Sequence, residues 1–353
     1  MRLLLDARKI EDYGIGVYIR QVFGRLLQPD FEDVRVIHLR GKARLPVPPE
    51  REIVAAARNY DPREQVEIPW KCRHLKDYYY FSPHYIFPLL MKQKLLVTVH
   101  DLIHFLFPDF FKPRIKVEVA RYFLREIKRR AVAIFAVSQR TAQDLNLLFS
   151  IPIEKIKIIY NGLSEEFFNL PTFPSHLPFP YILYVGNWKP HKNLPLLLRA
   201  FCQLSKKYPE IKLVLAGVER KPQVLGILAE LGLEERCLLP GFLPQEEIIR
   251  YLDGALFFVF PSLYEGFGLP PLEAMARGRA VLSSPGGSLK EILADAALYF
   301  DPASVDDLVA KMELFLTSEK ERHFYEEKGR LRSRLFRWEK ALEEYVHFLR
   351  NLD

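Results

Sequence analysis

Short apolar runs alternate along the whole chain with longer segments of helical periodicity, and this alternation limits the folds open to the chain. Repetition of strand, helix and strand places helices on both faces of a parallel sheet. The runs with the length of buried strands are Leu3–Leu5, Val34–Leu39, Lys94–Val99, Ala133–Val137, Lys157–Tyr160, Tyr181–Val185, Lys212–Ala216, Leu238–Pro240, Ala255–Phe260, Ala280–Ser283 and Ala297–Phe300. They predict an α/β fold built on parallel sheets.

A proline-rich segment divides these runs into two groups. Residues 170–180 hold four prolines in eleven residues, which can continue neither a helix nor a central strand. A chain of 353 residues is also long for a single core. We therefore predict one domain over 1–170, a linker over 171–180 and a second domain over 181–335. A charged helical segment over 336–353 would pack back on the N-terminal domain.

The excess positive charge is confined to the first half of the chain. Residues 1–170 hold 28 Lys/Arg against 20 Asp/Glu, whereas the remainder holds 23 against 24. A basic surface attracts phosphates, anionic lipid or nucleic acid, or it is simply solvated. Residues 104–130 mix bases with aromatics, which fits contact with a membrane surface or a lipid-linked acceptor. The same pattern fits an amphipathic helix packed on a sheet.

Cysteine usage and hydropathy bear on the compartment. Cys72, Cys202 and Cys237 are far apart and form no CxxC pair, so neither a disulfide framework nor a structural zinc site is expected. The apolar start of the chain ends at Asp6, too early for a signal peptide, and reads as a first strand. No apolar stretch approaches the roughly 20 residues that span a bilayer. We expect a cytoplasmic protein, with peripheral contact at the inner membrane face through the basic domain.

The most specific segment runs from Phe260 to Gly278. A buried strand ends near Phe260, glycines follow, and Pro270 and Pro271 can begin a helix. A glycine-rich turn into a helix N-terminus binds anions through its free amides and the helix dipole. Because the prolines carry no N–H, the donors should come from Gly266, Phe267, Gly268 and Leu269.

Two acids, Glu265 and Glu273, flank this turn with seven residues between them. A carboxylate beside a bound diphosphate is electrostatically unfavourable, whereas it accepts hydrogen bonds readily from hydroxyls. We expect these acids to hold sugar and ribose hydroxyls on the two sides of a diphosphate. Glu273 on its own would also suit the first turn of a helix.

This spacing of acids around Gly-Phe-Gly-Leu-Pro resembles the retaining glycosyltransferases of family 4, and the resemblance covers essentially the whole chain. It implies the GT-B fold, in which two Rossmann-like domains face each other across a cleft. It also implies transfer of a mannose- or glucose-type hexose from a nucleotide-diphosphate sugar to a glycan or lipid-linked acceptor. The mannosyltransferase-like subgroup is the most similar in overall look, which suggests GDP-mannose, with a UDP-sugar as the other donor. No metal or other cofactor is implied.

The resemblance also marks residues of the donor domain. Tyr184–Leu194 resembles its first strand and loop, and Lys192 matches a lysine that grips the diphosphate. Asn187 stands where the family often has an arginine, and Lys189 is the candidate for the missing charge. Gly241 and Phe242 lie where the family places the nucleotide base. An ordinary exposed lysine remains the other reading of Lys192.

Two segments of the first domain match the family as well. His100 ends a buried strand and is similar to a histidine near the sugar, expected to orient the sugar or the acceptor; a lone histidine is often only structural. Gly16 lies in Asp12–Tyr18, which follows the first strand and opens a helix. The resemblance implies a mobile loop there, near the donor phosphate and the acceptor, whereas the pattern alone fits a tight turn. His100, Lys192 and Glu265 are the expected catalytic residues.

Other function classes remain open. An epimerase or phosphorylase on the same fold, or a protein that only binds nucleotide sugars, would share many of these features. A nucleic-acid-binding protein is a further alternative because of the basic half. No nucleic-acid-binding module is recognisable in the sequence, so nucleic acid is not an expected partner.

Overall fold

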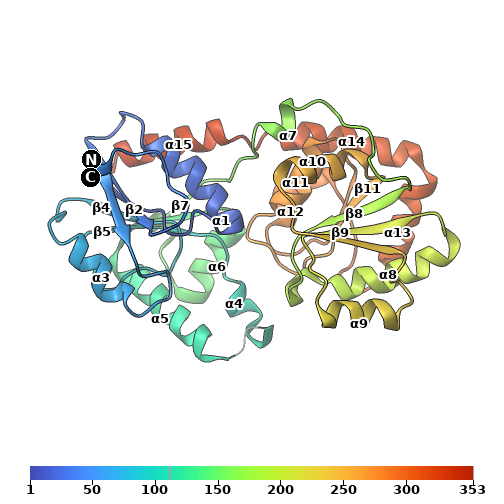
Figure 1. Cartoon of the computed structure of the whole chain (residues 1–353), viewed down its shortest axis with the longest axis horizontal. Coiled ribbons are helices and arrows are strands. Elements are labelled where there is room, and N and C mark those ends of the chain that lie inside the picture. Colours follow the sequence, from blue (N-terminus) through green and yellow to red (C-terminus); the bar gives the residue numbers. More distant parts are fainter. Residues whose placement is uncertain (111–112, 353) are drawn as a thin grey trace. The chain divides into compact units, whose positions relative to one another are not determined.

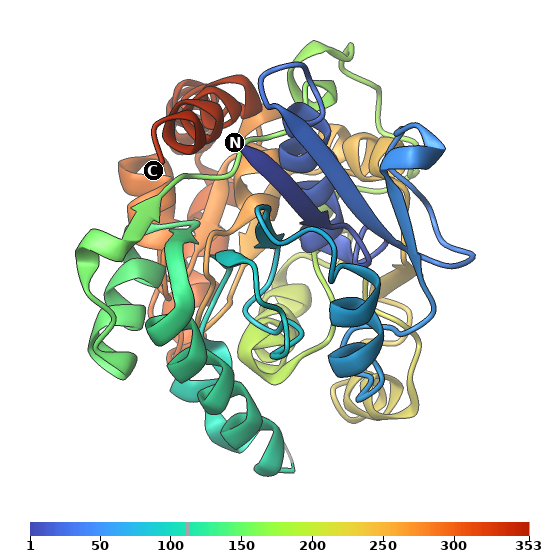
Figure 2. The same cartoon turned by 90° about the vertical axis from the view of Figure 1, so that its left-hand side faces the viewer.

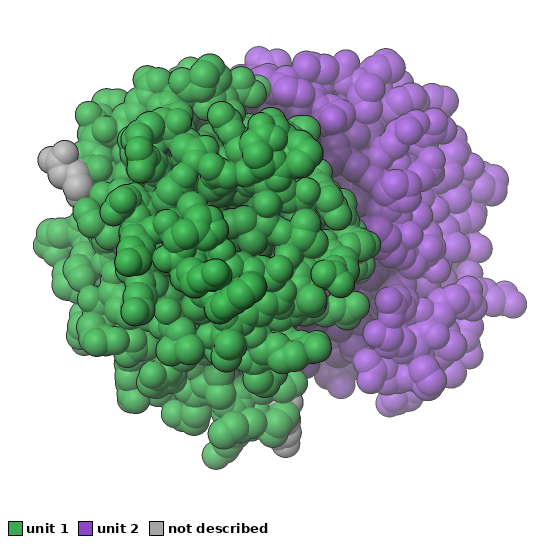
Figure 3. Space-filling view, turned by 60° about the vertical axis from the view of Figure 1, so that its left-hand side comes forward, with its two compact units in different colours: residues 1–162, 338–353 green, residues 163–337 purple. Residues whose placement is uncertain are grey.

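The computed structural model describes residues 1–110 and 113–352. The chain forms two compact units, coloured separately in Figure 3. Unit 1 comprises Met1–Gly162 and Trp338–Asp353, and unit 2 comprises Leu163–Arg337. The chain therefore passes between the units twice, before Leu163 and after Arg337.

Unit 1 is built on a parallel sheet in the order β3-β2-β1-β4-β5-β6-β7. Its strands are β1 (Arg2–Asp6), β2 (Asp33–Leu39), β3 (Glu52–Ala55), β4 (Tyr79–Ser82), β5 (Lys94–Val99), β6 (Ala131–Ala136) and β7 (Ile156–Ile158). Side chains alternate between two hydrophobic clusters, since Leu4 belongs to one and its neighbours Leu3 and Leu5 to the other. Both faces of the sheet are therefore covered (Figure 2).

The two faces of this sheet are covered by helices from different parts of the chain. Described helices of unit 1 are α1 (Tyr13–Tyr18), η1 (Ile19–Phe23), α2 (Gly24–Leu26), η2 (Pro49–Arg51), α3 (Glu64–Lys71), α4 (Ile103–Leu106), η3 (Pro108–Phe110), α5 (Ile115–Arg130), α6 (Gln139–Phe149), η4 (Ile153–Lys155) and α15 (Trp338–Arg350). One cluster takes residues from α3, α5 and α6. The other joins the start of the chain, α1 and η1, to α15 at its end.

Unit 2 repeats the design with a parallel sheet in the order β10-β9-β8-β11-β12-β13. The strands are β8 (Tyr181–Val185), β9 (Lys212–Ala216), β10 (Cys237–Gly241), β11 (Phe257–Phe260), β12 (Val281–Ser283) and β13 (Leu298–Tyr299). The helical segments are α7 (Glu166–Asn169), η5 (Pro190–Lys192), α8 (Leu194–Lys207), α9 (Pro222–Glu230), α10 (Gln245–Gly254), α11 (Leu269–Ala276), α12 (Leu289–Leu293), η6 (Ala294–Ala296), α13 (Val305–Thr317) and α14 (Glu319–Ser333).

Every apolar run expected to be a strand is one, with ends that shift by at most two residues. Two strands, β3 and β4, have no counterpart among those runs. The short β3 pairs only with β2. The sequence of β4 is Tyr-Tyr-Phe-Ser. Its polar hydroxyl groups are untypical of a central strand, so the apolar pattern did not predict it. In the fold, the Tyr80 hydroxyl is satisfied because it donates to the Asp6 carboxylate at 2.6 Å.

Two helices end the chain, and a short connection between them leads the chain back to unit 1. Residues 334–337 separate α14 from α15. In α15, the Tyr345 hydroxyl accepts a hydrogen bond from the Tyr18 hydroxyl at 3.0 Å, so the end of the chain packs against its beginning (Figure 1). Trp338, Ala341 and Leu349 complete this buried contact.

The proline-rich segment 171–180 belongs to unit 2. The Arg277 guanidinium donates to the carbonyl oxygens of Leu170 and Pro171 at 2.8 and 2.9 Å. It also forms a buried ion pair with Asp253 at 2.6 Å, and Asp253 accepts a hydrogen bond from the Phe173 amide. Prolines cannot supply backbone donors, so these side chains fix the segment.

Within residues 1–110 and 113–352, none of the helices combines the length and apolar character that crossing a bilayer requires.

Candidate active site

Lys192 and Glu265 meet at the carboxyl edge of the unit 2 sheet. Lys192 ends η5 in the loop after β8, and Glu265 lies in the loop after β11. The Lys192 Nζ lies 2.6 Å from the Glu265 Oε1 and 5.3 Å from the centre of the Phe260 ring. Both charged side chains are about 15% exposed, at 15% and 14%. The loops therefore enclose most of the pair and leave a small part of it accessible.

Backbone contacts interlock three loops around this pair. The Leu263 amide donates to the His191 carbonyl at 2.7 Å, which joins the β11 loop to the β8 loop. The amide and hydroxyl of Ser288 donate to the Glu265 carbonyl at 3.0 and 3.1 Å, which joins it to the loop after β12. Gly287 has φ +64, and a Cβ there would collide with the Glu265 backbone. The position of Glu265 thus depends on a glycine distant in sequence.

The turn into α11 has the expected form. Gly266, Phe267 and Gly268 are buried, and Leu269 is half-buried at the first position of the helix. Gly268 is the N-cap with φ +99, a conformation that favours glycine. Proline occupies the first turn, as predicted.

Glu273 lies on α11, two residues after Pro271. Burial raises the pKa of this carboxyl to about 7, and no other cause contributes. A carboxyl group that is desolvated without a compensating cation is prepared to accept hydrogen bonds from a ligand. Hydroxyl groups that donate to it would favour the charged form.

Asn187 lies two residues after the end of β8, and its Oδ1 is buried without a hydrogen-bond partner among the residues that the structure describes. Its carbonyl accepts a hydrogen bond from the Tyr184 hydroxyl at 3.3 Å, which fixes the backbone at this position. Lys189, two residues further on, is exposed. Gly241 ends β10 and accepts a hydrogen bond from the Gly217 amide at 2.7 Å, and the neighbouring Phe242 side chain is 65% exposed.

His100 follows β5 in unit 1. Its Nε2 lies 2.9 Å from the Pro83 carbonyl oxygen, so this nitrogen carries the proton and the Nδ1 is the acceptor. Burial lowers the pKa of His100, which keeps the ring neutral near pH 7. The ring packs edge-on against Tyr18, with centres 5.1 Å apart. His100 is therefore suited to accept a hydrogen bond from a hydroxyl rather than to carry charge.

Gly16 lies within α1 and not in a loop. A Cβ at this position would collide with the Ile10 carbonyl, whose oxygen also accepts a hydrogen bond from Arg20 at 2.7 Å. The glycine is required by this close approach of helix and loop. The expectation of a loop at Gly16 is corrected accordingly.

The expected site residues are distributed over both units. Unit 2 holds Asn187, Lys192, Gly241, Phe242 and the segment 265–273, with direct contact between Lys192 and Glu265. Unit 1 holds Gly16 and His100 at the carboxyl edge of its own sheet.

One buried group at that edge of unit 1 was missed from the sequence. Arg8 forms ion pairs with Asp6 at 2.7 Å and Glu64 at 2.9 Å, and all three side chains are at most 2% exposed. Asp6 and Arg8 do stand directly at the end of the first strand, which is the one signal that the sequence offered.

Both halves of the chain match families of glycosyltransferases. Residues 172–332 match the family described as Glycosyl transferases group 1, and residues 14–167 match the family described as Glycosyltransferase Family 4. O-antigen chain mannosyltransferase B of Escherichia coli is 30% identical over 84% of this chain and 79% of its own length. The serotype-specific mannosyltransferase WbdA of Escherichia coli is 31% identical over 72% of this chain, which spans 30% of that longer protein.

Two solved structures share the fold. Sucrose-phosphate synthase from Thermosynechococcus elongatus has a TM-score of 0.77 at 20% identity, over 100% of this chain and 99% of that one. HepE from Anabaena, solved in complex with UDP and glucose, has a TM-score of 0.77 at 16% identity, over 100% of both chains.

Proposed function

Because this chain belongs to the GT-B glycosyltransferases, we propose that it transfers a hexose, in the first instance mannose, from a nucleotide-diphosphate sugar. The acceptor is a glycan or a lipid-linked glycan, and the anomeric configuration is retained, as in family 4. The observation that carries the proposal is the Lys192–Glu265 pair, held at 2.6 Å by interlocked loops beside the N-terminus of α11. A cation, a glycine-rich helix N-terminus and carboxylates in one place match a phosphate flanked by hydroxyls.

The mannose assignment is supported by the relatives named mannosyltransferases over most of this chain. A donor that carries UDP remains the second candidate, in line with the UDP complex of HepE. The base would contact the backbone at Gly241 and Phe242. The ribose hydroxyls would donate to Glu273, whose pKa is raised to about 7 by burial and would fall on binding.

The proposed transfer is a displacement on one face of the sugar. The bond between the anomeric carbon and the diphosphate oxygen breaks, and its electron pair stays on that oxygen. The acceptor hydroxyl oxygen forms the new bond to the anomeric carbon, and its proton passes to the departing diphosphate oxygen. Lys192 and the amides of residues 266–269 stabilise the charge that develops there. Glu265 positions Lys192 and accepts hydrogen bonds from sugar hydroxyls.

Two further residues have supporting roles in this proposal. The Nδ1 of neutral His100 accepts a hydrogen bond from a hydroxyl of the sugar or the acceptor and thereby orients it. Asn187 presents its buried Oδ1 where the family often carries an arginine. Lys189 supplies the charge that this substitution removes. A divalent metal is not required in this scheme, because lysine and amides neutralise the diphosphate.

The first experiment is a thermal-shift panel of UDP, GDP, ADP and their sugars, with and without EDTA. A ligand at 100 times its Kd stabilises the folded state by about 2.7 kcal/mol. We expect GDP and GDP-mannose to raise the Tm most, with no effect of EDTA. If no nucleotide raises the Tm, the donor assignment fails.

An epimerase or a phosphorylase on the same fold is distinguished by its products. Nucleotide release that requires an acceptor indicates transfer. Interconversion of nucleotide sugars without release would indicate an epimerase, and release that depends on inorganic phosphate would indicate a phosphorylase.

We also propose that α5 rests on an anionic lipid surface at the cytoplasmic face of the membrane. The helix packs one apolar stripe into unit 1 but leaves a second one in solvent: Ile115, Val119 and Tyr122 are 65%, 45% and 50% exposed. The helix and its N-cap also carry Arg114, Lys116, Arg121, Arg125, Lys128 and Arg129. Glu118 and Glu126 pair with Arg121 and Arg129 at 3.5 and 2.7 Å, so the helix keeps a net positive charge. An exposed apolar ridge on a basic helix matches the interface of an anionic bilayer.

Sedimentation with vesicles tests this surface. The full chain should bind phosphatidylglycerol vesicles at low salt and phosphatidylcholine vesicles weakly, because the attraction is screened by salt. Replacing Ile115, Val119 and Tyr122 together by serine should abolish binding. Val66→Ser, on the surface of α3 and 66% exposed, is the matched control. Equal binding by the triple variant would refute the assignment.

A further inference from the structure

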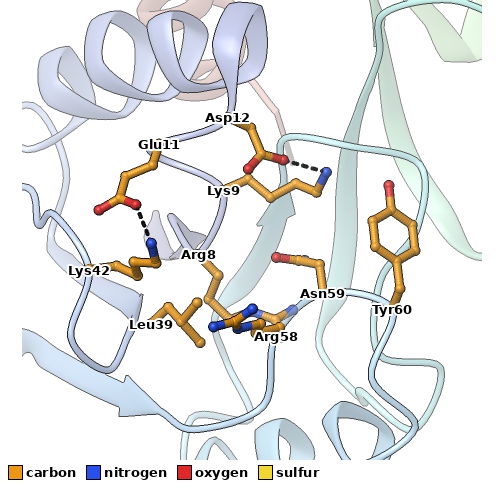
Figure 4. A pocket seen from close by; sticks show the side chains of 9 residues that line it. All are labelled: Arg8, Lys9, Glu11, Asp12, Leu39, Lys42, Arg58, Asn59 and Tyr60. Carbon is orange, nitrogen blue, oxygen red and sulfur yellow. Dashed lines mark hydrogen bonds and ion pairs between the residues drawn. The ribbon is translucent and has the colours of Figure 1, made fainter. Parts of the chain in front are cut away.

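A pocket of about 300 Å³ lies at the carboxyl edge of the unit 1 sheet (Figure 4). Its walls come from the ends of three adjacent strands and the segments that follow them. The lining residues are Arg8, Lys9, Glu11 and Asp12 after β1, Leu39 and Lys42 at the end of β2, and Arg58, Asn59 and Tyr60 after β3. Ligands of parallel α/β sheets bind outside the carboxyl ends of the strands. The volume is at the lower end of the range for small-molecule sites, which suits a single ring.

The charges in this pocket are largely paired with one another. The Lys9 Nζ lies 2.8 Å from the Asp12 carboxylate, and the Lys42 Nζ lies 2.6 Å from the Glu11 carboxylate (Figure 4). Arg8 is neutralised from behind by Asp6 and Glu64. The pocket therefore presents many hydrogen-bond donors and acceptors with little net charge. This favours a neutral, polyhydroxylated ligand over a phosphate, which needs several uncommitted cations.

Tyr60 stands at the edge of the pocket in an unusual backbone conformation. Its φ is +71, which for a bulky residue costs on the order of 1–3 kcal/mol. The Tyr60 amide donates to the Glu64 carboxylate at 3.1 Å, and Glu64 forms a buried ion pair with Arg8. These contacts stabilise the strained backbone conformation of Tyr60. The side chain remains 56% exposed. Glycine would relieve the strain at this position.

The surroundings of Tyr60 position the ring. The Lys9 Nζ lies 4.9 Å from the ring centre, and the His84 ring lies edge-on at 6.0 Å. Lys9 is also close enough to His100 for its charge to contribute to the lowered pKa of that histidine, after burial. The pocket and His100 therefore share one edge of unit 1.

We propose that this pocket binds one sugar ring of the glycan acceptor, with the C–H face of the ring packed against Tyr60. Asp12, Glu11 and Asn59 exchange hydrogen bonds with its hydroxyls, and Arg58 donates to them. A sugar ring combines apolar C–H surface with closely spaced hydroxyls, which matches an exposed aromatic beside paired charges. The assignment to the acceptor rests on the proposed glycosyl transfer; the binding of a sugar ring does not.

Saturation-transfer NMR on the full chain tests the pocket. The probes are methyl α-mannoside, methyl α-glucoside and methyl β-N-acetylglucosaminide. We expect at least one to bind the wild type and to bind Tyr60→Gly about tenfold more weakly, the effect of about 1.4 kcal/mol. The Tm of Tyr60→Gly should be unchanged or higher, because glycine accepts φ +71 without strain. This readout separates lost binding from lost folding.

Matched variants complete the experiment. Trp70→Ala removes an aromatic side chain of similar exposure, 61%, from α3 of the same unit and should bind the probe like the wild type. Asn59→Ala should weaken binding. The proposal is overturned if no probe binds the wild type, or if Tyr60→Gly binds as tightly as the wild type. Displacement of the probe by inorganic phosphate, lost in Arg58→Ala, would overturn it in favour of an anion site.

Nucleotide binding distinguishes this proposal from the donor assignment. GDP or UDP should raise the Tm of Tyr60→Gly as it does that of the wild type, because the donor residues lie in unit 2. Failure of all nucleotides to bind, with methyl glycoside binding intact, would remove the transfer reaction but leave the sugar pocket.

Discussion

Both units end their parallel strands in loops that carry polar side chains, but different contacts hold these loops in place. In unit 2, backbone hydrogen bonds and glycines lock the loops that carry Lys192 and Glu265. In unit 1, a buried group of charges formed by Asp6, Arg8 and Glu64 supports the loops around the pocket. The loops after the strands are thus held by backbone contacts in unit 2 and by buried side-chain ion pairs in unit 1.

The difference determines which side chains remain available to a ligand. Loops fixed by their backbone leave Lys192 and Glu265 free to change partners when a charged ligand arrives. In unit 1, Arg8 is committed to support: burial raises the pKa of Asp6, but the neighbouring Arg8 outweighs burial and holds that pKa below its ordinary value. Arg8 therefore keeps the surrounding loops rigid. The proposed ligand contacts come from other residues of the pocket, such as Asp12, Asn59 and Tyr60.

The largest expected effect comes from removing the charge at the centre of unit 1. Arg8→Ala leaves two buried carboxylates unpaired, which should cost about 3–5 kcal/mol of unfolding free energy in urea denaturation. Arg2→Ala breaks a pair with Glu32 whose side chains are 43% and 56% exposed, and should change the unfolding free energy far less, because solvent screens the pair. Similar losses in the two variants would show that unit 1 does not depend on its buried charges.

In unit 2 the corresponding removal should affect catalysis and not stability. Lys192→Ala should lower kcat/KM for transfer by about 10²–10³, equivalent to about 2.7–4 kcal/mol, with little change in Tm. The matched control is Lys221→Ala, a lysine paired with Glu219 at 2.7 Å whose side chain is 59% exposed. Near-normal turnover by Lys192→Ala would remove the lysine from the mechanism.

A glycine substitution tests whether the backbone holds the unit 2 loops. Gly287→Ala puts a side chain on a left-handed residue and against the Glu265 backbone, and should cost about 1–3 kcal/mol of unfolding free energy and reduce transfer. Gly226→Ala, inside α9 with open space around it, should instead stabilise by about 0.5–1 kcal/mol. If both substitutions are neutral, the loops are not locked as described.

The smallest effect should depend on pH. Because burial raises the pKa of Glu273 from 4.5 to about 7, the folded state keeps a proton that the unfolded state has already lost in this range. Wild-type stability should therefore fall as the pH rises from 4.5 to 7. Glu273→Gln should be more stable than the wild type at pH 8, by on the order of 1–2 kcal/mol for a half-buried group, and not at pH 4. A difference independent of pH would contradict this.

Sequence patterns alone were sufficient for most of the framework. The apolar runs predicted all the strands that they named, because a buried parallel strand needs a continuous apolar stretch of that length. The α/β fold with two parallel sheets and the glycosyltransferase assignment are confirmed. Glycines and prolines between residues 266 and 271 predicted the start of α11, since their backbone limits are local properties.

Tertiary structure decided what depends on partners far apart in the chain. The polar strand β4 is central only because β1 and β5 pair with it and Asp6 accepts its tyrosine hydroxyl. Lys192 and Glu265 are 73 residues apart, and their contact requires the loops after β8 and β11 to meet. Tyr60 has no sequence signature at all: its strained backbone follows from Glu64 and Arg8, which the fold brings together. Local preferences fix elements, whereas burial and charge between distant residues decide which side chains face a ligand.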